Sequence, residues 1–336
     1  MKPGDSMTNR VASDFKDRFQ KIVGKPLLEG VLLRDLSNFR IGGPADHFFE
    51  AGTAVDLRGA IRAARESGLP HYVMGGGFNI LFDDAGFRGL LIKIALRGME
   101  FLGPEPGTVA GTRTGAGAGT GRIRVAAGEP IHDLLEFSAA LGYEGIEFLA
   151  GIPGTVGGAV FGNAGAFGWA IGDFLEEALL SGPDGEEFRV GRGFFKFSYR
   201  HSMLKIKHDL LLEAIFTLKL GSGDMVRTKI SEYLALRAEK HPPQETAYAG
   251  SYFKNPIRAD GTKTAAGLLL EQAGARGMRI GGAAVAACHC NFLVNENNAT
   301  AWDVLTLAAE LKARVRAKFG IDLEEEVIFV PASGPC

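Results

Sequence analysis

The sequence predicts an α+β protein made of two α/β subdomains followed by a C-terminal α+β domain. The chain has 336 residues, too many for one ordinary hydrophobic core, so two or three domains are expected. The hydrophobic pattern over residues 39–94 alternates between strand and helix. Short strands dominate residues 101–220, and a helix with clear start and stop signals lies near the C-terminus.

The composition is that of an ordinary globular protein, with 46% apolar and 23% charged residues. Lys and Arg number 37 and Asp and Glu 39, a formal net charge of -2. This balance argues against partners such as nucleic acid or an anionic membrane, although local groups can still bind a small anion. No apolar run reaches the roughly 20 residues that span a bilayer, and residues 1–15 lack a signal-peptide core. We expect a cytoplasmic protein, and a monomer.

The first 100 residues divide into a tail and a compact unit. Residues 1–30 are expected to form a tail with one short amphipathic helix near Asp14–Val23. The first α/β subdomain then spans residues 31–100. Its strands are expected at residues 46–50, 71–74 and 90–94, with a helix at residues 54–67.

A second subdomain, residues 101–222, is expected to contain short strands and one helix at residues 131–141. Its glycine-rich tract at residues 107–121 is typical of a flexible hairpin tip or an insertion. The C-terminal domain, residues 223–336, begins with a polar helix over residues 226–240. That helix is ended by His241, Pro242 and Pro243.

The last predicted helix is signalled at both ends. Thr300 and Asp303 match a capping box, and Gly320 is a typical C-terminal stop. The apolar face of this helix is formed by Val304, Ala308, Leu311, Val315 and Phe319. Residues 321–330 are expected to form a final strand.

The three cysteines are Cys288, Cys290 and Cys336. Their odd number, and the single residue between two of them, argue against a disulfide framework and for reduced thiols. The Cys288-His289-Cys290 sequence has no matching ligand pair elsewhere, as a zinc site would require. We expect a structural strand here and no metal site.

Three consecutive glycines, Gly75, Gly76 and Gly77, follow the predicted strand at residues 71–74. Such glycines allow positive φ angles and bring unhindered N–H groups against a phosphate. The segment is not a G-x-G-x-x-G dinucleotide motif, because Ile80 stands where the third glycine belongs and no helix pattern follows. A plain turn and a phosphate-binding loop both remain open for this motif alone.

A second glycine-rich segment runs over residues 147–160 and continues into residues 163–166. It can form a tight loop whose amides face a pyrophosphate, and the alternative is a tight packing corner. Two such loops in neighbouring subdomains favour a dinucleotide cofactor. The expected cofactor-binding residues are Gly75, Gly76, Gly77, Phe78, Asn79, Gly151, Ile152, Pro153, Gly154, Thr155, Gly157, Gly158, Asn163, Ala164 and Gly165.

Six motifs together resemble the UDP-N-acetylenolpyruvoylglucosamine reductase family over about residues 34–330. They are Asn38–Ala45, the Gly75 loop, Gly151–Ala159, Tyr199–Lys205, Gly250–Pro256 and Glu271–Gly282. The Ser-Tyr-Phe-Lys-Asn-Pro sequence, residues 251–256, is similar to the shorter of the family's two subtypes. The resemblance implies a vanillyl-alcohol-oxidase-like FAD-binding fold with a C-terminal substrate-binding domain, which agrees with glycine loops that are not of the dinucleotide type.

The resemblance also implies a reaction in the synthesis of peptidoglycan precursors. NADPH would reduce a non-covalently bound FAD, and the reduced FAD would pass hydride to the enolpyruvyl double bond of UDP-N-acetylglucosamine enolpyruvate. The product would be UDP-N-acetylmuramate. Negative charge develops on the carbon that bears the carboxylate, so the site must stabilise that charge and protonate that carbon.

Three residues match the family's catalytic positions. Ser251 would donate the proton, which a carbanion-like intermediate is basic enough to take. Arg200 would bind the substrate carboxylate and its enolate form. Judged without the resemblance, Ser251 is an ordinary turn serine, and Arg200 is a surface cation stacked on the neighbouring aromatic ring.

Glu326 is the third matching residue and would help to stabilise the enolate. Strand alternation places it on one face with Ile328 and Val330, where a carboxylate needs a partner or a function. Glu325 stands where the family commonly has proline, so the choice of Glu326 over Glu324 depends on alignment to Val327.

Further residues match polar positions of the family's substrate site. They are Tyr199, Asn255 and Gln272, for which ordinary turn and helix hydrogen bonding is the alternative. Arg237 and Lys240 end the polar helix and can reach the UDP phosphates, although a solvated helix face is the plainer interpretation. Phe78 stands where relatives usually have serine, which removes one side-chain hydrogen bond to the flavin phosphates.

Two other functions remain open at this stage. One is an oxidase or dehydrogenase of the same flavin fold, whose members often tether the flavin through a histidine near the first glycine loop. Here the nearest histidine is His71, several residues before that loop. The other is a catalytically silent nucleotide-binding protein, which the presence of Arg200, Ser251 and Glu326 together disfavours.

Overall fold

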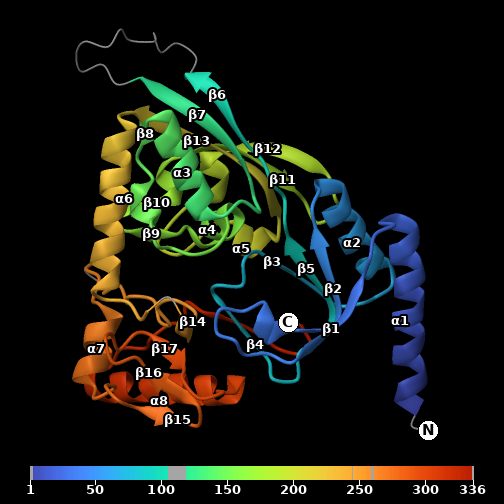
Figure 1. The fold of residues 1–336 in the computed structure, drawn as a ribbon. Helices are drawn as coiled ribbons and strands as arrows, with labels where there is room; N and C mark the ends of the chain where they lie inside the picture. Colours follow the sequence, from blue (N-terminus) through green and yellow to red (C-terminus); the bar gives the residue numbers. More distant parts are fainter. Residues whose placement is uncertain (1–2, 105–118, 244, 259–260, 335–336) are drawn as a thin grey trace.

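The computed structural model describes residues 3–104, 119–243, 245–258 and 261–334 (Figure 1). Two α/β units lie above and beside a C-terminal unit, and α6 (Gly223–Ala238) runs along one side to join them. The predicted glycine tract falls almost entirely outside the described residues. The strands that flank it, β6 (Met99–Pro104) and β7 (Thr120–Ala126), pair antiparallel. No helix in the described part of the chain is long and apolar enough to cross a membrane.

The first subdomain is a four-stranded sheet in the order β1-β2-β5-β3. Its elements are β1 (Leu28–Leu32), β2 (Pro44–Ala51), α2 (Ala54–Glu66), β3 (His71–Met74) and β5 (Phe87–Ile94). β2, β5 and β3 are parallel, and β1 pairs antiparallel with β2. The Thr53 hydroxyl caps α2 by accepting from the Asp56 N–H at 3.1 Å. All the strands and the helix predicted between residues 46 and 94 are present.

The N-terminal helix is longer than the sequence predicts. α1 spans Pro3–Ile22 instead of beginning near Asp14. Phe15 and Phe19 are buried in the same core as Phe49 of β2, so the helix belongs to the first subdomain. Apolar spacing marks the part of α1 around Phe15 and Phe19, whereas the sequence before it is mostly polar and gives no such signal.

The second subdomain is built on an antiparallel sheet in the order β12-β11-β13-β7-β6, with β8 paired to β13. The remaining strands are β8 (Tyr143–Glu144), β11 (Leu175–Ser181), β12 (Glu187–Gly191) and β13 (Leu210–Leu220), and the short pair β9 (Gly165–Ala166) and β10 (Trp169–Ala170) lies apart. The helices are α3 (Ile131–Leu141), α4 (Val156–Gly162) and α5 (Leu204–Lys207), with single 3-10 turns at Glu147–Leu149, Ile171–Asp173 and Arg192–Phe195.

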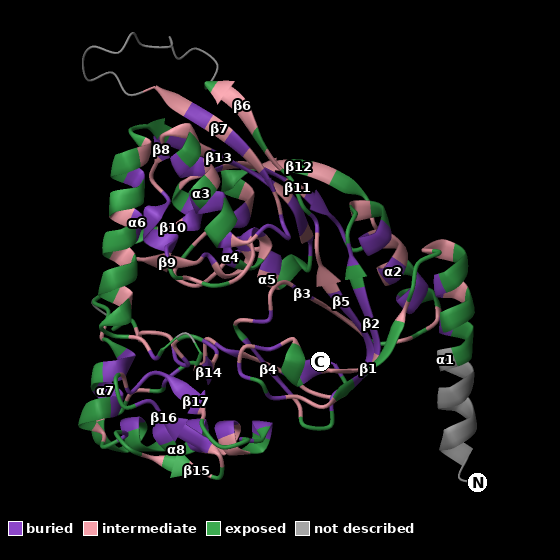
Figure 2. Ribbon diagram, in the orientation of Figure 1, coloured by how far each residue is buried: buried purple, intermediate pink, exposed green. Residues whose placement is uncertain are grey.

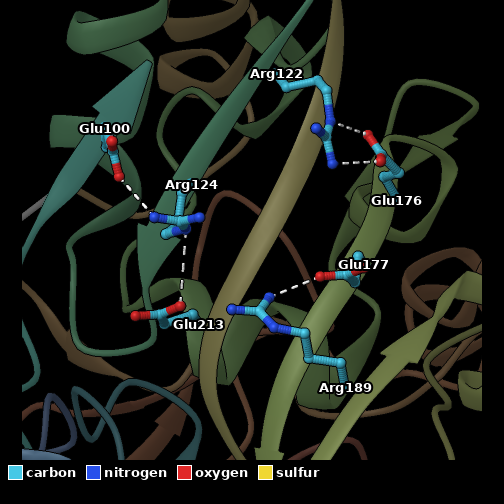
Figure 3. Close-up of polar contacts among 7 residues, drawn as sticks. All are labelled: Glu100, Arg122, Arg124, Glu176, Glu177, Arg189 and Glu213. Atoms are coloured by element: carbon cyan, nitrogen blue, oxygen red, sulfur yellow. Dashed lines mark hydrogen bonds and ion pairs between the residues drawn. The ribbon is translucent and has the colours of Figure 1, made fainter. Parts of the chain in front are cut away.

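The two faces of this sheet differ. α3 and α4 contribute Leu134, Val156 and Val160 to the core that the sheet also lines. Charged side chains form pairs between strands, three across neighbouring strands and one, Arg122–Glu176, from β7 to β11 across β13 (Figure 3). They are Arg122–Glu176, Arg124–Glu100, Arg124–Glu213 and Arg189–Glu177. Partly exposed cross-strand pairs of this kind contribute little individually, on the order of 0.2–1 kcal/mol.

The C-terminal domain packs two helices on a small antiparallel sheet in the order β14-β17-β16-β15. Its elements after α6 are β14 (Ala247–Tyr248), α7 (Ala266–Gln272), β15 (Arg279–Ile280), β16 (Ala283–Val285), β17 (Leu293–Asn295) and α8 (Ala301–Phe319). The predicted capping box of Thr300 and Asp303 is present, and Gly320 ends α8 with a φ of 67°. Val304, Ala308, Leu311 and Val315 are buried, whereas Phe319 is only partly buried. Figure 2 shows this core and the largely exposed α6.

Two predicted strands differ from the structure. The final strand is only Ile328–Val330 (β18), which pairs in parallel with β4 (Ile80–Phe82) of the first subdomain. Residues 321–327 run beside the Tyr252–Lys254 segment without forming a strand. Among the described residues, the two segments share one isolated β-bridge, between Phe253 and Glu325. Cys288–Cys290 also form no strand. They lie in the turn between β16 and β17, where Cys288 is exposed and Cys290 buried, both as free thiols.

Candidate active site

The first glycine loop connects β3 to β4 and approaches the backbone of its neighbours closely. Gly77 has a φ of 74°, and a Cβ there would collide with the Leu36 carbonyl oxygen. A Cβ on Gly75 would lie 2.6 Å from the Thr155 hydroxyl. Within the described part of the chain, the N–H groups of Gly76, Gly77 and Phe78 donate to no protein acceptor. A loop with open amides and no room for side chains fits the phosphates of a cofactor.

The second glycine loop lies directly against the first. Gly151 and Gly154 have φ angles of 74° and 124°, and a Cβ on Gly154 would lie 3.8 Å from the Phe78 ring. Helix α4 was not predicted from the sequence; the Thr155 hydroxyl caps it by accepting from the Gly158 N–H at 3.3 Å. The short span between Thr155 and Asn163 hides this helix from periodicity.

The amides at the start of α4 are already hydrogen-bonded within the protein. The Val156 N–H donates to the Glu129 carbonyl, and the Gly157 N–H donates to the Ala127 carbonyl, both at 2.8 Å. A Cβ on Gly157 would lie 3.0 Å from that same carbonyl oxygen. The second loop therefore combines the two interpretations of its sequence: its early residues face the first loop, and its later residues form a packing corner.

The other predicted cofactor residues lie on both sides of these loops. Asn79 donates from Nδ2 to the Glu326 carbonyl at 2.9 Å, which connects the first loop to the C-terminal segment. Asn163 ends α4, and Ala164 and Gly165 lead into β9. Ile152 and Pro153 lie in the second loop between its two positive-φ glycines.

Arg200 and Glu326 meet although they are far apart in the sequence. Their side chains form an ion pair with Nε and Oε1 2.5 Å apart, and they are 23% and 20% exposed. The Arg200 Nε–H has no acceptor in line with it among the described residues, so the contact is an ion pair without an aligned hydrogen bond. Arg200 also donates from Nη1 to the Gly165 carbonyl at 3.0 Å.

The Glu326 carboxyl has a raised pKa. Burial is the main cause, because it disfavours the charged form, and the positive charges of Arg200, Lys205 and Lys254 oppose it. Lys205 has a lowered pKa, caused first by burial and then by the charge of Lys254. Glu326 and Lys205 are thus both partly desolvated, and both lie within the electrostatic reach of Arg200 and Lys254.

The segment that follows Ser251 is hydrogen-bonded through its backbone to the segment that contains Glu326. The Glu326 N–H donates to the Tyr252 carbonyl and the Lys254 N–H donates to the Glu324 carbonyl, each at 2.8 Å. The Ser251 hydroxyl is half-buried and makes no hydrogen bond to other described residues. Glu324, the alternative to Glu326, is 74% exposed and pairs with Lys254 at 2.8 Å. The geometry therefore brings Glu326, and not Glu324, to Arg200.

The expected substrate residues fall into two groups. The Tyr199 hydroxyl accepts from the Asn255 N–H at 3.1 Å, and the Asn255 Oδ1 accepts from the Ala266 N–H at 2.9 Å. Lys263 lies over the Tyr199 ring at 4.0 Å, and Arg200 lies 5.4 Å from it. Gln272 lies at the end of α7 and is exposed. Its backbone carbonyl accepts a hydrogen bond from the Lys318 Nζ at 2.5 Å, and its side chain makes no hydrogen bond to another residue of this group.

Two lysines of this site were not predicted from the sequence. Lys205 donates to the Arg200 carbonyl at 2.8 Å, and Lys254 pairs with Glu324. Both lie inside motifs that carry the family resemblance, so their motif membership was the available signal. No group of three or more His, Cys, Asp or Glu side chains among the described residues has the arrangement of a metal site.

Arg237 is a further cation near Arg200, on the last turn of α6. Its guanidinium lies over the Phe167 ring at 5.5 Å and donates to the Phe148 carbonyl at 3.3 Å. Its pKa is lowered by burial and by the charge of Arg200. The structure gives it no carboxylate partner among the described residues, so its charge is available to an anionic ligand.

Comparisons with known proteins agree with this geometry. The C-terminal domain model of UDP-N-acetylenolpyruvoylglucosamine reductase matches residues 242–330, and an FAD binding domain matches residues 45–191. The reductase of that name from Solibacter usitatus is 38% identical, covering 88% of this chain and 93% of its own. That from Geotalea uraniireducens is 39% identical, covering 87% and 89%. The crystal structure of the Thermus caldophilus reductase aligns with a TM-score of 0.70 at 29% identity, covering 89% of this chain and 97% of its own.

The expected vanillyl-alcohol-oxidase-type FAD-binding fold followed by the C-terminal domain is thus confirmed. With relatives above 30% identity over most of both chains, the chain belongs to the UDP-N-acetylenolpyruvoylglucosamine reductase family of flavin-dependent oxidoreductases.

Proposed function

We propose that this protein reduces UDP-N-acetylglucosamine enolpyruvate to UDP-N-acetylmuramate, with non-covalently bound FAD as cofactor and NADPH as hydride donor. The observation that carries the proposal is the convergence of Arg200, Glu326 and the Ser251 segment at one half-buried site. A bound FAD, held between the two glycine loops, would supply hydride transfer from NADPH to the terminal carbon of the enolpyruvyl double bond. We also propose the shorter subtype, on the Ser251–Pro256 motif.

Arg200 binds the carboxylate of the enolpyruvyl group. Its guanidinium is partly desolvated, and its only charged contact among the described residues is Glu326. A charge-assisted contact in such an environment is strongest when negative charge builds on the carboxylate as the enolate forms. Arg200 therefore contributes more to the transition state than to the bound substrate.

Glu326 acts best in its protonated form. Burial already raises the pKa of this carboxyl, and a substrate carboxylate on Arg200 would raise it further by repulsion. A protonated Glu326 can donate a hydrogen bond to the enolate, whereas an ionised one would repel it. The ion pair between Arg200 and Glu326 in the free protein is therefore lost when Arg200 binds the substrate carboxylate and Glu326 becomes protonated.

Ser251 supplies the proton that completes the reduction. Hydride adds to the terminal carbon, the electron pair of the double bond moves to the carbon bearing the carboxylate, and the Ser251 hydroxyl protonates that carbon. The hydroxyl regains its proton from solvent. Its freedom from hydrogen bonds to other described residues leaves it able to point at the substrate.

The remaining assignments follow the same geometry. Gly75–Asn79 and the early second-loop residues Gly151–Thr155 hold FAD, the first through open amides and the second as the facing wall. Tyr199 and Asn255 line the substrate side, and Arg237, which has no carboxylate partner among the described residues, binds the UDP phosphates. We also propose a cytoplasmic monomer, and the net charge of -2 argues against binding to nucleic acid or to an anionic membrane.

Anaerobic stopped-flow absorbance of the purified protein tests this function. NADPH should bleach the flavin band, and the UDP-enolpyruvyl sugar should then restore it. In Ser251→Ala, reduction by NADPH should be unchanged, and reoxidation should slow by about a thousandfold, the scale of a lost general acid. Acid denaturation should release free FAD. A protein without flavin, or a reduced flavin that ignores this sugar, would overturn the proposal.

A further inference from the structure

Arg200 lies in a backbone conformation that needs support. Ser198 and His201 exchange backbone hydrogen bonds of 3.2 and 3.1 Å, which closes a two-residue turn holding Tyr199 and Arg200. Arg200 has a φ of 56°, in the left-handed region. That region costs a non-glycine residue about 1–2 kcal/mol, so the surrounding structure must hold the turn in place.

Asn163 holds the base of this turn. Its Nδ2 donates to the Ser198 carbonyl at 2.8 Å, and its Oδ1 accepts from the Gly172 N–H at 3.1 Å. The residue is 6% exposed and has a φ of 45° at the end of α4. Both ends of the amide are therefore bonded to protein backbone, and the side chain is buried.

Two further contacts join the same segments. The Lys205 Nζ donates to the Arg200 carbonyl at 2.8 Å, and the Arg200 Nη1 donates to the Gly165 carbonyl at 3.0 Å. Ser202 donates from its hydroxyl to the Phe161 carbonyl at 2.8 Å. The end of α4 and the arginine turn thus form one hydrogen-bonded unit, in which the Asn163 and Ser202 side chains are both buried.

We propose that Asn163 is a positioning residue for Arg200, acting on the turn and not on the flavin. The proposal rests on the function proposed above, because it takes Arg200 as the group that binds the substrate carboxylate. It replaces the sequence-based assignment of Asn163 to the cofactor. Loss of the amide would let the turn relax and move the guanidinium, and a misplacement of about 1 Å can cost on the order of a hundredfold in rate.

Asn163→Gly tests this directly, because glycine accepts the positive φ and removes only the side-chain bonds. We expect flavin reoxidation by substrate to slow by about 10–100-fold, with unchanged FAD content, flavin spectrum and rate of reduction by NADPH. Asn163→Asp is the second variant. It keeps the acceptor for the Gly172 N–H, places an oxygen against the Ser198 carbonyl, and should slow reoxidation at least as much.

Asn298→Gly is the matched control, since Asn298 is an exposed asparagine with a φ of 50° outside the site. It should react like wild type. A double-mutant cycle then separates the roles: in an Arg200→Ala background, Asn163→Gly should change reoxidation by less than about twofold, because coupled residues are not additive.

The outcomes distinguish this proposal from the proposed function. If the wild-type protein fails to reduce the UDP-sugar, the function itself is wrong. If the wild type is active and Asn163→Gly instead lowers FAD affinity, or slows reoxidation equally with and without Arg200, the positioning role is overturned. If Asn163→Gly is too unstable to purify, Asn163→Asp carries the same cycle.

Discussion

The two glycine-rich loops have similar compositions, yet their backbone amides have different partners. In the first loop, the N–H groups of Gly76, Gly77 and Phe78 have no acceptor among the described residues. In the second, the N–H groups of Val156 and Gly157 are bonded to carbonyls of the strand-to-helix connection before α3. Glycine in the first loop leaves amides open for a ligand, and glycine at the start of α4 lets a helix approach a backbone closely. Composition alone does not separate these two uses.

The largest effect is expected at Gly77. Gly77→Ala forces a Cβ against the Leu36 carbonyl oxygen and keeps a φ of 74°, so we expect a loss of about 3 kcal/mol or more in the free energy of unfolding. The loop would also lose its cofactor geometry, so FAD content should fall. Denaturant unfolding and the flavin absorbance of the purified protein measure both.

Gly30→Ala is the control for Gly77→Ala. Gly30 has a φ of 65° with no atom near its missing Cβ, so it carries the backbone penalty alone, about 1 kcal/mol. Equal losses at the two positions would mean that the approach of Leu36 is unimportant. Full FAD content in a folded Gly77→Ala protein would remove the first loop from the cofactor site.

A smaller effect is expected at Gly157, on stability and not on the cofactor. A Cβ there lies 3.0 Å from the Ala127 carbonyl oxygen, which is backbone and cannot easily move. Gly157→Ala should therefore cost about 1–2 kcal/mol of unfolding free energy despite the better helix propensity of alanine. FAD affinity of the folded protein, measured by titration after flavin removal, should stay within about twofold, a change of roughly 0.4 kcal/mol.

Gly162→Ala is the control in the same helix, because no atom lies near its missing Cβ. It should raise the free energy of unfolding by about 0.5–1 kcal/mol through helix propensity. A clear drop in FAD affinity for Gly157→Ala would show that the second loop binds the cofactor as directly as the first.

The contrast between the two loops also explains which helices and strands could be predicted from the sequence. Strand and helix periods predicted β2, α2, β3 and α3 to within a few residues, because each buries an apolar face. Helix α4 was missed, since a seven-residue, glycine-rich helix has no such face and begins at a capping threonine. β18 was predicted too long, because Leu323 and Val327 are buried by packing with the C-terminal core and not by strand alternation.

The candidate site shows a similar limit. The family motifs identified Arg200, Ser251 and Glu326, but no pattern in the sequence places a residue of the second subdomain 2.5 Å from one near the C-terminus. That pairing depends on the parallel contact of β18 with β4, which returns the end of the chain to the first subdomain. Asn163 lies in a motif predicted to hold cofactor, and only the three-dimensional structure shows its amide bonded to Ser198 and Gly172.

The smallest expected effect concerns the one bulky side chain of the first loop. A Cβ on Gly76 would lie 2.8 Å from the Phe78 ring, and the ring also lies near Gly154, so Phe78 fills space between the two loops. Phe78→Ser would open that space and add a hydroxyl beside the free amides. One hydrogen bond to a phosphate contributes about 0.5–1.5 kcal/mol, so FAD should bind up to about tenfold more tightly.

Equilibrium titration of flavin-free protein with FAD measures this change. Phe78→Ala removes the ring without adding a hydroxyl, so it distinguishes the effect of the hydroxyl from the effect of the added space. Tighter binding in Phe78→Ser but not in Phe78→Ala would assign the gain to a hydrogen bond in the first loop. Equal gains would mean that the ring obstructs the cofactor. Weaker binding in both would mean that the ring supports the contact between the loops, and that the second loop depends on packing even where it faces the ligand.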